Sequence, residues 1–264
     1  MGAGDSDPRL FRVQGGDLFV IRYKNNPHRL RSLVNDYVGS RIAEELGLPC
    51  LQVEIVELSK ELIEANDLCK RYHAATCEWT TTNERLQAGL QFGSPFVKDG
   101  QNGVPELIKK VTNLSDIPGS ILFDTWTMND DRKRDRNLFV SWVGTGKKRR
   151  YKYLMIDHDQ CFTGSSWNEN IIRESGYTDR LFGMHPALVE TVEEPSDFDE
   201  WFEAINAFPE SAITRILEDV PDEWSLSANE KAALRAFLIE RRKVLRACFH
   251  KNLRHFPFKQ RRGK

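Results

Sequence analysis

A charge-rich stretch, "TMNDDRKRDRNLFV" at residues 127–140, places carboxylates, amides and bases between two apolar runs. Phosphoryl transfer needs a carboxylate to orient the attacking hydroxyl, oxygen ligands for Mg²⁺ and a positively charged side chain that contacts the phosphates. The stretch offers several oxygen-bearing side chains for the first two tasks: Asn129, Asp130, Asp131, Asp135 and Asn137. Composition alone leaves open a second interpretation, in which this is a solvated connecting loop.

A β-hairpin is predicted directly after the charge-rich stretch. "NLFVSWVG" and "YKYLMID" read as two strands joined by the basic turn "TGKKRR". An antiparallel pair returns the chain to the end from which it left, so Asn137 and Asp157 should lie at the same end of the hairpin. A cation could bridge these two side chains.

The N-terminal region supplies the positively charged side chains. Residues 10–24 predict two short strands around Gly15 and Gly16, and the alternation of a strand puts Arg22 and Lys24 on one face. The next segment, residues 30–46, has the apolar period of a helix, and Gly47 ends it. Asp36 lies on the less apolar side of this helix and could meet Arg22 or Lys24.

The remaining elements follow from the same patterns. Residues 51–58 alternate as a strand, a helix begins near Ser59, and residues 80–103 favour an irregular segment. A buried helix is predicted from about Gly119, and further helices near 186–193, 197–207, 209–219 and 227–254. This order predicts an α+β protein with two lobes, the second of them mainly helical.

Two stretches together resemble the HipA-like kinase family. "NDDR…NLF" followed by "YLMIDHD" is similar to that family's catalytic loop and metal-binding Asp, and residues 20–58 are similar to its N-lobe. The resemblance implies a protein-kinase-like fold, with a small β-rich N-lobe at residues 1–57. A larger helical C-lobe carrying the catalytic hairpin would span residues 58–264. It also implies ATP as phosphoryl donor, Mg²⁺ as cofactor, and Ser or Thr hydroxyls of a protein as acceptor.

The resemblance also implies roles for individual residues. Asp131 would be the catalytic carboxylate, with Asn137 and Asp157 as the magnesium ligands. The nucleotide would be held by a larger set, with the 56–58 backbone as hinge: Ile21, Arg22, Lys24, Asp36, Val56, Glu57 and Leu58. Asn137 follows Asp131 by six residues, where related kinases commonly have five, so Asp130 or Asp135 could take one of the roles.

Arg22 stands where the family usually has a phosphate-contacting Lys, which keeps open a catalytically impaired protein of the same fold that binds nucleotide or a partner.

Bulk composition adds little about partners. The 38 basic and 39 acidic residues nearly cancel, so net charge favours no class of ligand. The basic tail "RHFPFKQRRGK" and the hairpin turn leave a nucleic-acid-associated regulator as a further alternative. An odd number of cysteines, with no secretory leader and no apolar run near 18 residues, predicts a cytoplasmic protein that does not enter a membrane.

Overall fold

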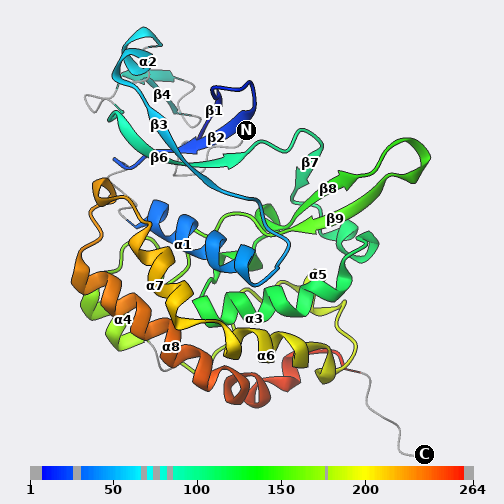
Figure 1. Cartoon of the computed structure of the whole chain (residues 1–264). Helices are drawn as coiled ribbons and strands as arrows, with labels where there is room; N and C mark the ends of the chain where they lie inside the picture. Colours follow the sequence, from blue (N-terminus) through cyan, green and yellow to red (C-terminus); the bar gives the residue numbers. More distant parts are fainter. Residues whose placement is uncertain are drawn as a thin grey trace, which may run out of the picture.

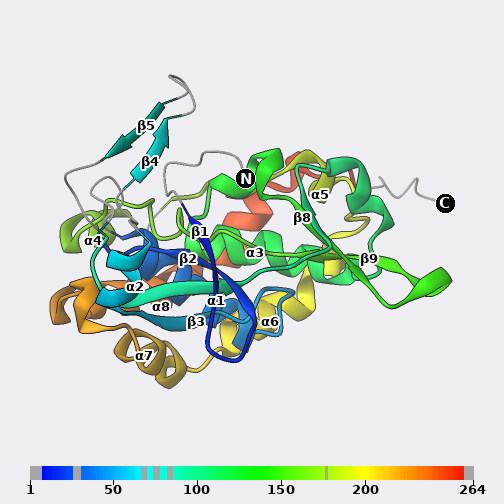
Figure 2. The ribbon, with the colours of Figure 1, turned by 90° about the horizontal axis from the view of Figure 1, so that it is seen from above.

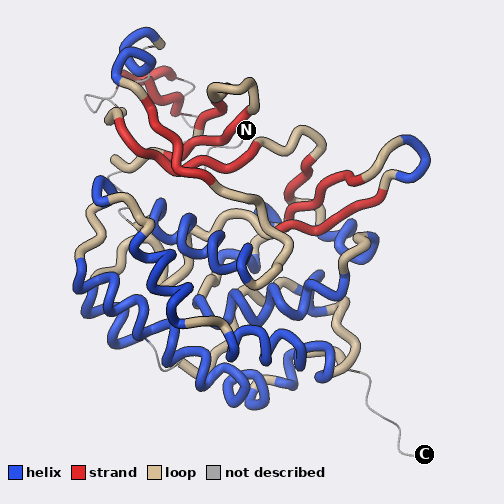
Figure 3. The backbone as a smooth tube through the Cα atoms, viewed as in Figure 1, coloured by secondary structure: helices blue, strands red, loops and turns tan. Residues whose placement is uncertain are grey.

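The computed structural model describes residues 8–25, 31–66, 70–73, 78–81, 86–175 and 178–258. It has a small, mostly antiparallel β part above a larger helical part, as Figures 1 and 3 show. The predicted α+β class with a small β-rich part and a larger helical part is confirmed.

The upper sheet has four strands in the order β1-β2-β6-β3, and each neighbouring pair is antiparallel. Three of these strands lie where sequence periodicity predicts them: β1 Arg9–Arg12, β2 Leu18–Arg22 and β3 Glu54–Leu58. The fourth, β6 Gly89–Pro95, is an inner strand of the sheet. The predicted irregular segment at residues 80–103 is therefore wrong over these residues.

Glycine gives β6 room to pack between its neighbours, and it also explains why the sequence of β6 does not look like a strand. A Cβ on Gly93 would lie 2.6 Å from Cγ2 of Val56 and 3.1 Å from Cδ1 of Ile21. A strand interior uses glycine where another chain approaches this closely, although glycine lowers the intrinsic strand preference. Pairing with β2 and β3 therefore decides the conformation of β6.

The predicted lobe boundary between residues 57 and 58 cuts this sheet, because β6 lies after it and pairs with strands before it. Three more elements stand beside the sheet in Figures 1 and 2: α2 Lys60–Ala65, β4 Lys70–His73 and β5 Glu78–Thr81. The predicted Ser cap of α2 is present, since Ser59 Oγ accepts the Leu62 amide at 3.2 Å.

Helix α1, Ser32–Glu45, lies between the upper sheet and the helical part (Figure 1). It contacts β6 on one side and α7 on the other. Most of the helix is buried, and the buried residues include Asp36, whose side chain is 2% exposed. A charged residue buried on a central helix requires a partner, and its partners belong to the site.

A second sheet has the order β7-β8-β9, with β7 Gly100–Asn102, β8 Phe139–Val143 and β9 Arg150–Leu154. Strands β8 and β9 form the predicted hairpin, which projects from the body of the molecule (Figure 1). Beyond β9, the Met155 amide donates to the Pro49 carbonyl at 2.5 Å. This bond ties the chain before Asp157 to the segment that follows α1.

The helical part packs around α8, Ala228–Lys251, which contacts α3, α4, α6 and α7. A capping box between Ser227 and Glu230 begins α8. The other α-helices are α3 Ile117–Thr127, α4 Glu169–Ser175, α5 Pro186–Val189, α6 Asp199–Ala207 and α7 Glu210–Glu218. Short 3₁₀ turns complete the fold: η1 Pro105–Lys110, η2 Leu114–Asp116, η3 Asp131–Lys133, η4 Asp135–Asn137, η5 Gly146–Lys148, η6 Pro195–Phe198, η7 Asp222–Trp224 and η8 Leu253–His255.

The predicted helices of the C-terminal half are all present, with shifted ends. Among the described residues, no helix is both long and apolar enough to cross a membrane.

Candidate active site

The hairpin brings Asn137 and Asp157 to one cavity. Strand β8 begins two residues after Asn137, and β9 ends three residues before Asp157, with Phe139 opposite Leu154. Both side chains line a cavity of about 600 Å³ together with Asp131. The juxtaposition predicted from the hairpin is thus present.

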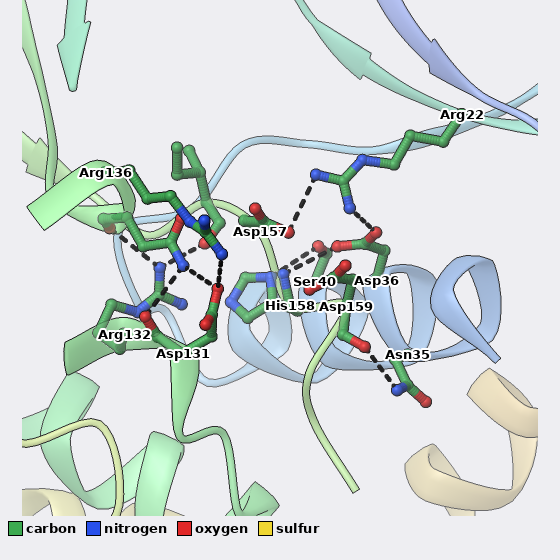
Figure 4. A network of polar contacts seen from close by, with 12 residues as sticks. Arg22, Asn35, Asp36, Ser40, Asp131, Arg132, Arg136, Asp157, His158 and Asp159 are labelled. Carbon is green, nitrogen blue, oxygen red and sulfur yellow. Dashed lines mark hydrogen bonds and ion pairs between the residues drawn. The ribbon is translucent and has the colours of Figure 1, made fainter. Parts of the chain in front are cut away.

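Asp131 begins the η3 turn and is held by three side chains, of which Figure 4 labels Arg136. The side-chain amide of Asn137 donates to Asp131 Oδ2 at 2.6 Å and to the Asp131 backbone carbonyl at 3.0 Å. Arg134 Nε lies 2.7 Å from Oδ1, and Arg136 Nη2 lies 3.2 Å from Oδ2. The Asp131 side chain is 8% exposed, whereas the two arginines are each 54% exposed, so only the carboxylate has a constrained position.

Arg132, the next residue, points the opposite way and is completely buried. Its Nε donates to Asp124 Oδ2 at 3.1 Å, and Nη1 donates to the carbonyls of Asn137, at 3.4 Å, and Ile156. One guanidinium therefore joins α3, the turn that carries Asn137 and the end of the hairpin before Asp157. Arg132 positions the site without lining the cavity.

Three carboxylates of the cavity lining meet. Oxygen atoms of Asp131, Asp157 and Asp159 all lie within 4.8 Å of one another. A group of carboxylate oxygens at this spacing suits a hard divalent cation such as Mg²⁺, and the Asn137 side-chain oxygen is a further ligand of the same kind. The donor set therefore fits a magnesium or manganese ion.

Asp159 is the residue of this group that sequence reasoning missed. The signal was the repeat of Asp at positions 157 and 159, which strand alternation would put on one face but about 7 Å apart. Asp157 has a positive φ of 59°, so the chain turns there and Asp159 lies beside Asp157 in the carboxylate cluster.

Arg22 connects this carboxylate cluster to α1. Its Nη1 donates to Asp36 Oδ2, and its Nη2 donates to Asp157 Oδ1 at 3.0 Å (Figure 4). Burial opposes ionisation of Asp157, but the charge and hydrogen bond of Arg22 outweigh it and lower the Asp157 pKa to about 2. The planar fork of an arginine can hold two carboxylates at once, which an ammonium group does less well.

Buried Asp36 has its pKa raised by desolvation, which the Arg22 charge only partly offsets.

Helix α1 also holds the backbone that follows Asp157. Asp36 Oδ1 accepts the His158 amide at 2.8 Å, and the Asn35 amide donates to the carbonyls of Asp159 and Cys161 at 2.8 and 2.9 Å. A Cβ on Gly39 would lie only 2.8 Å from Cβ of His158. Glycine at this position lets the segment after Asp157 lie directly against the helix.

His158 is a structural residue in this arrangement. Its Nδ1 lies 3.1 Å from Ser40 Oγ, and burial lowers its pKa well below the usual value, so the imidazole is neutral. Through this contact with α1 it fixes the backbone between Asp157 and Asp159.

Much of the cavity lining is apolar. These side chains come from β2, the segment before β3, β6 and the residues just after it, and the hairpin: Val20, Leu51, Val53, Phe92, Phe96, Val97, Phe139 and Ile156. A cavity that combines apolar walls with charged side chains suits a nucleotide, whose base is flat and apolar and whose phosphates are anionic.

Several predicted nucleotide contacts do not lie at this cavity. Ile21 and Leu58 pack with Ile63 in a separate apolar cluster, since alternation turns Ile21 away from the face that carries Val20 and Arg22. Val56 packs against that same cluster, and Glu57 is exposed. Lys24 forms an ion pair with Glu223 of η7. Of the predicted nucleotide residues, the cavity lining includes Arg22 and Asp36.

A family model matches most of the chain. The family model described as HipA-like kinase matches residues 1–256. No curated protein matches the chain.

Two solved structures share the fold. The crystal structure of a Helicobacter pylori proinflammatory kinase, CtkA, has a TM-score of 0.59 and 10% identity over 94% of each chain. The Golgi casein kinase with Mn/ADP bound has a TM-score of 0.50 and 14% identity over 95% of this chain and 72% of its own.

Shewanella oneidensis MR-1 HipA, in a complex with HipB and operator DNA, has a TM-score of 0.36 and 12% identity, over 88% of this chain and 57% of its own.

Proposed function

The chain belongs to the HipA-like kinase family, and we propose that it transfers the γ-phosphate of ATP, with Mg²⁺, to Ser or Thr hydroxyls of a protein. The observation that carries this proposal is the cluster of Asp131, Asp157 and Asp159 in the lining of a nucleotide-sized cavity. The structural neighbour with bound Mn and ADP supports the use of a nucleotide with a divalent cation.

The cavity suggests how ATP would bind. Adenine would lie against the apolar walls, beside residues 96–98 that follow β6, instead of the 56–58 segment predicted from the sequence. The phosphates would then extend toward Arg22, Asn137 and the carboxylate cluster. A cation held by Asp157, Asp159 and Asn137 would neutralise phosphate charge.

Asp131 would orient the acceptor hydroxyl and receive its proton. A bond forms between the hydroxyl oxygen and the γ-phosphorus, the bond to the β–γ bridging oxygen breaks, and ADP leaves. Asn137 holds the Asp131 carboxylate through its amide, and Arg132 holds the turn beneath it, so the base is positioned before substrate binds.

The same residues also suggest the alternative of a catalytically impaired protein that binds nucleotide. Arg22 already occupies Asp157, a proposed metal ligand, and Arg134 and Arg136 contact both oxygens of Asp131. If these contacts persist with nucleotide present, the protein binds ATP without transferring phosphate. We favour transfer because Arg134 and Arg136 are half exposed and can leave the carboxylate at little cost.

We also propose that this activity is cytoplasmic. Three cysteines in the described part of the chain, Cys50, Cys161 and Cys248, are thiols, as a reducing compartment would keep them.

Transfer of labelled phosphate from ATP tests the proposal. Purified protein with Mg²⁺ and a mixture of protein acceptors should incorporate label, and Asp131→Ala and Asp157→Asn should each reduce the rate at least about 100-fold. Asp199→Ala removes an exposed carboxylate of α6 and should have no effect.

Nucleotide binding is measured on the same preparations by the thermal shift that ATP and Mg²⁺ cause. A shift without transfer would favour the impaired relative. The absence of both the shift and the transfer would exclude the kinase proposal altogether.

A further inference from the structure

Four basic side chains surround Asp131 and its neighbour Asp130. Arg134 and Arg136 contact Asp131, while Lys133 and Arg180 contact Asp130 at 2.5 and 3.0 Å. All four are between 51% and 58% exposed. A third acid of the same loop, Asp135, lies 2.8 Å from His185 Nε2. The four cations are exposed enough to exchange these partners for carboxylates of a ligand at little cost.

The four bases face different spaces. Arg136 lines the nucleotide cavity, whereas Lys133, Arg134 and Arg180 are not part of its lining. Arg136 is therefore placed for the phosphates of the nucleotide. Arg134 contacts the other oxygen of Asp131, the carboxylate that would orient the acceptor hydroxyl.

Arg180 leads from the catalytic turn into a second cavity, of about 610 Å³. Its guanidinium stacks on Phe182 at 4.4 Å, which orients the charged group although the side chain is 58% exposed. The floor of this cavity is apolar and includes Leu181, Met184, Val189 and Phe256. Arg254 and His255 are further basic groups at its edge, and the acid Glu190 is paired with Lys109 at 2.8 Å.

From this arrangement we infer that the acceptor is an acidic peptide segment of a protein. Carboxylates next to the acceptor hydroxyl bind Arg134 and Arg180, and an apolar side chain of the same segment enters the second cavity. The hydroxyl itself displaces Arg134 from Asp131, which frees that guanidinium for a substrate carboxylate. This inference rests on the proposed kinase activity, since it names the acceptor for the same site.

A peptide fits these observations better than a nucleic acid. A protein surface that binds nucleic acid combines Lys and Arg side chains with exposed aromatic rings on which nucleobases stack. The second cavity instead offers mainly aliphatic and thioether groups around the buried Phe256. Apolar side chains spaced along a peptide match a groove of this kind, and acidic residues match its rim.

Direct binding tests the inference without requiring transfer. The probe is a fluorescein-labelled peptide with a central Ser, Asp on both sides and a Leu-Phe pair at one end, and a second peptide has Asn in place of every Asp. Fluorescence anisotropy at 0.15 M salt should show at least tenfold tighter binding of the acidic peptide, roughly two ion pairs' worth. Arg134→Gln and Arg180→Gln should each weaken its binding about fivefold.

Arg246→Gln is the matched control. Arg246 also stacks on a phenylalanine, Phe202 at 4.5 Å, and also forms exposed ion pairs, but with Asp199 and Glu203 of α6. It should leave peptide binding unchanged. Arg134→Gln and Arg180→Gln should keep the thermal shift caused by ATP and Mg²⁺, which confirms that they fold and that the nucleotide cavity is intact.

Equal binding of the Asp and Asn peptides, no binding of either, or an equal loss in the Arg246 variant would each overturn the inference. Tighter binding of labelled oligothymidine than of the acidic peptide would also overturn it, in favour of a nucleic-acid surface. Acidic-peptide binding without phosphate transfer would support the surface and contradict only the kinase proposal.

Discussion

Two neighbouring residues of the η3 turn lie in different environments. Asp131 faces the cavity, while the Arg132 side chain is fully buried against Asp124, whose side chain is also fully buried. A buried ion pair contributes little net stability, but the loss of one partner leaves an uncompensated charge in the interior. The Asp124–Arg132 pair is therefore a sensitive point in the positioning of the site.

Replacing Arg132 with Met should lower the free energy of unfolding by about 3–5 kcal/mol, because Asp124 loses its buried partner. Urea denaturation followed by tryptophan fluorescence measures this change. Arg246→Met removes an exposed arginine and should cost less than about 1 kcal/mol. Equal costs for the two variants would mean that the Asp124–Arg132 pair does not hold the turn.

Asp124 should also give the stability a pH dependence. Burial raises its pKa to about 6, although Arg132 partly offsets this effect. Because the folded pKa lies above the unfolded value, the stabilisation is complete below about pH 4 and is lost as pH rises through about 6. The amide introduced by Asp124→Asn does not titrate, so this variant should lack that loss.

Measured as a difference between parent and Asp124→Asn, the stability gap should narrow by on the order of 2–3 kcal/mol between pH 4 and pH 7. Urea titrations at half-unit steps of pH test this expectation. A constant gap would show that Asp124 has an ordinary pKa in the folded protein.

The β8–β9 hairpin is the element that brings Asn137 and Asp157 together. Its five-residue strands pair in register from Phe139 opposite Leu154 to Val143 opposite Arg150, and Trp142 lies against Tyr151 with ring centroids 4.0 Å apart. These cross-strand contacts, and not the basic tip, should set the register.

The tip should therefore be dispensable for phosphate transfer. Replacing residues 144–149 with Asn-Gly, a two-residue hairpin turn, removes the exposed ion pair of Arg149 with Asp99 and should cost less than about 2 kcal/mol. Transfer of labelled phosphate should stay within about threefold of the parent rate. A large loss of transfer at unchanged stability would instead assign the basic tip a role in substrate binding.

At the scale of the whole molecule, η7 joins the helical part to the upper sheet. Trp224 Nε1 donates to the Leu90 carbonyl of β6 at 2.8 Å, and its ring meets Tyr37 of α1 edge-on at 5.8 Å. The adjacent Glu223 accepts the Leu90 amide at 3.2 Å and pairs with Lys24 of the sheet. Lys24 thus contributes to the contact between the two parts.

Trp224→Ala should lower the free energy of unfolding by about 3–5 kcal/mol, since a buried indole and its hydrogen bond are both lost. Trp224→Phe keeps most of the ring packing and should cost only about 1–2 kcal/mol. Hydrogen exchange should show faster exchange of β6 amides in the Ala variant. Unchanged β6 exchange would mean that η7 does not secure the sheet.

Local patterns by themselves determined much of this protein. The helix at residues 30–46, the hairpin after Asn137 and the C-terminal helices follow from apolar periodicity and turn residues, which act over a few positions along the chain. The meeting of Asn137 with Asp157 follows as well, because an antiparallel hairpin must return to its starting end.

Only the tertiary structure decided the rest. β6 is a strand because β2 and β3 pair with it, despite glycines that weaken its local preference. Residues 96–98, which follow β6, line the cavity that we propose for the nucleotide, whereas residues 56–58 are not part of its lining. Asp159 joins Asp157 through a positive-φ turn, and Arg22 bridges Asp36 and Asp157 across 135 positions of sequence. These contacts depend on packing between distant segments, which no local pattern encodes.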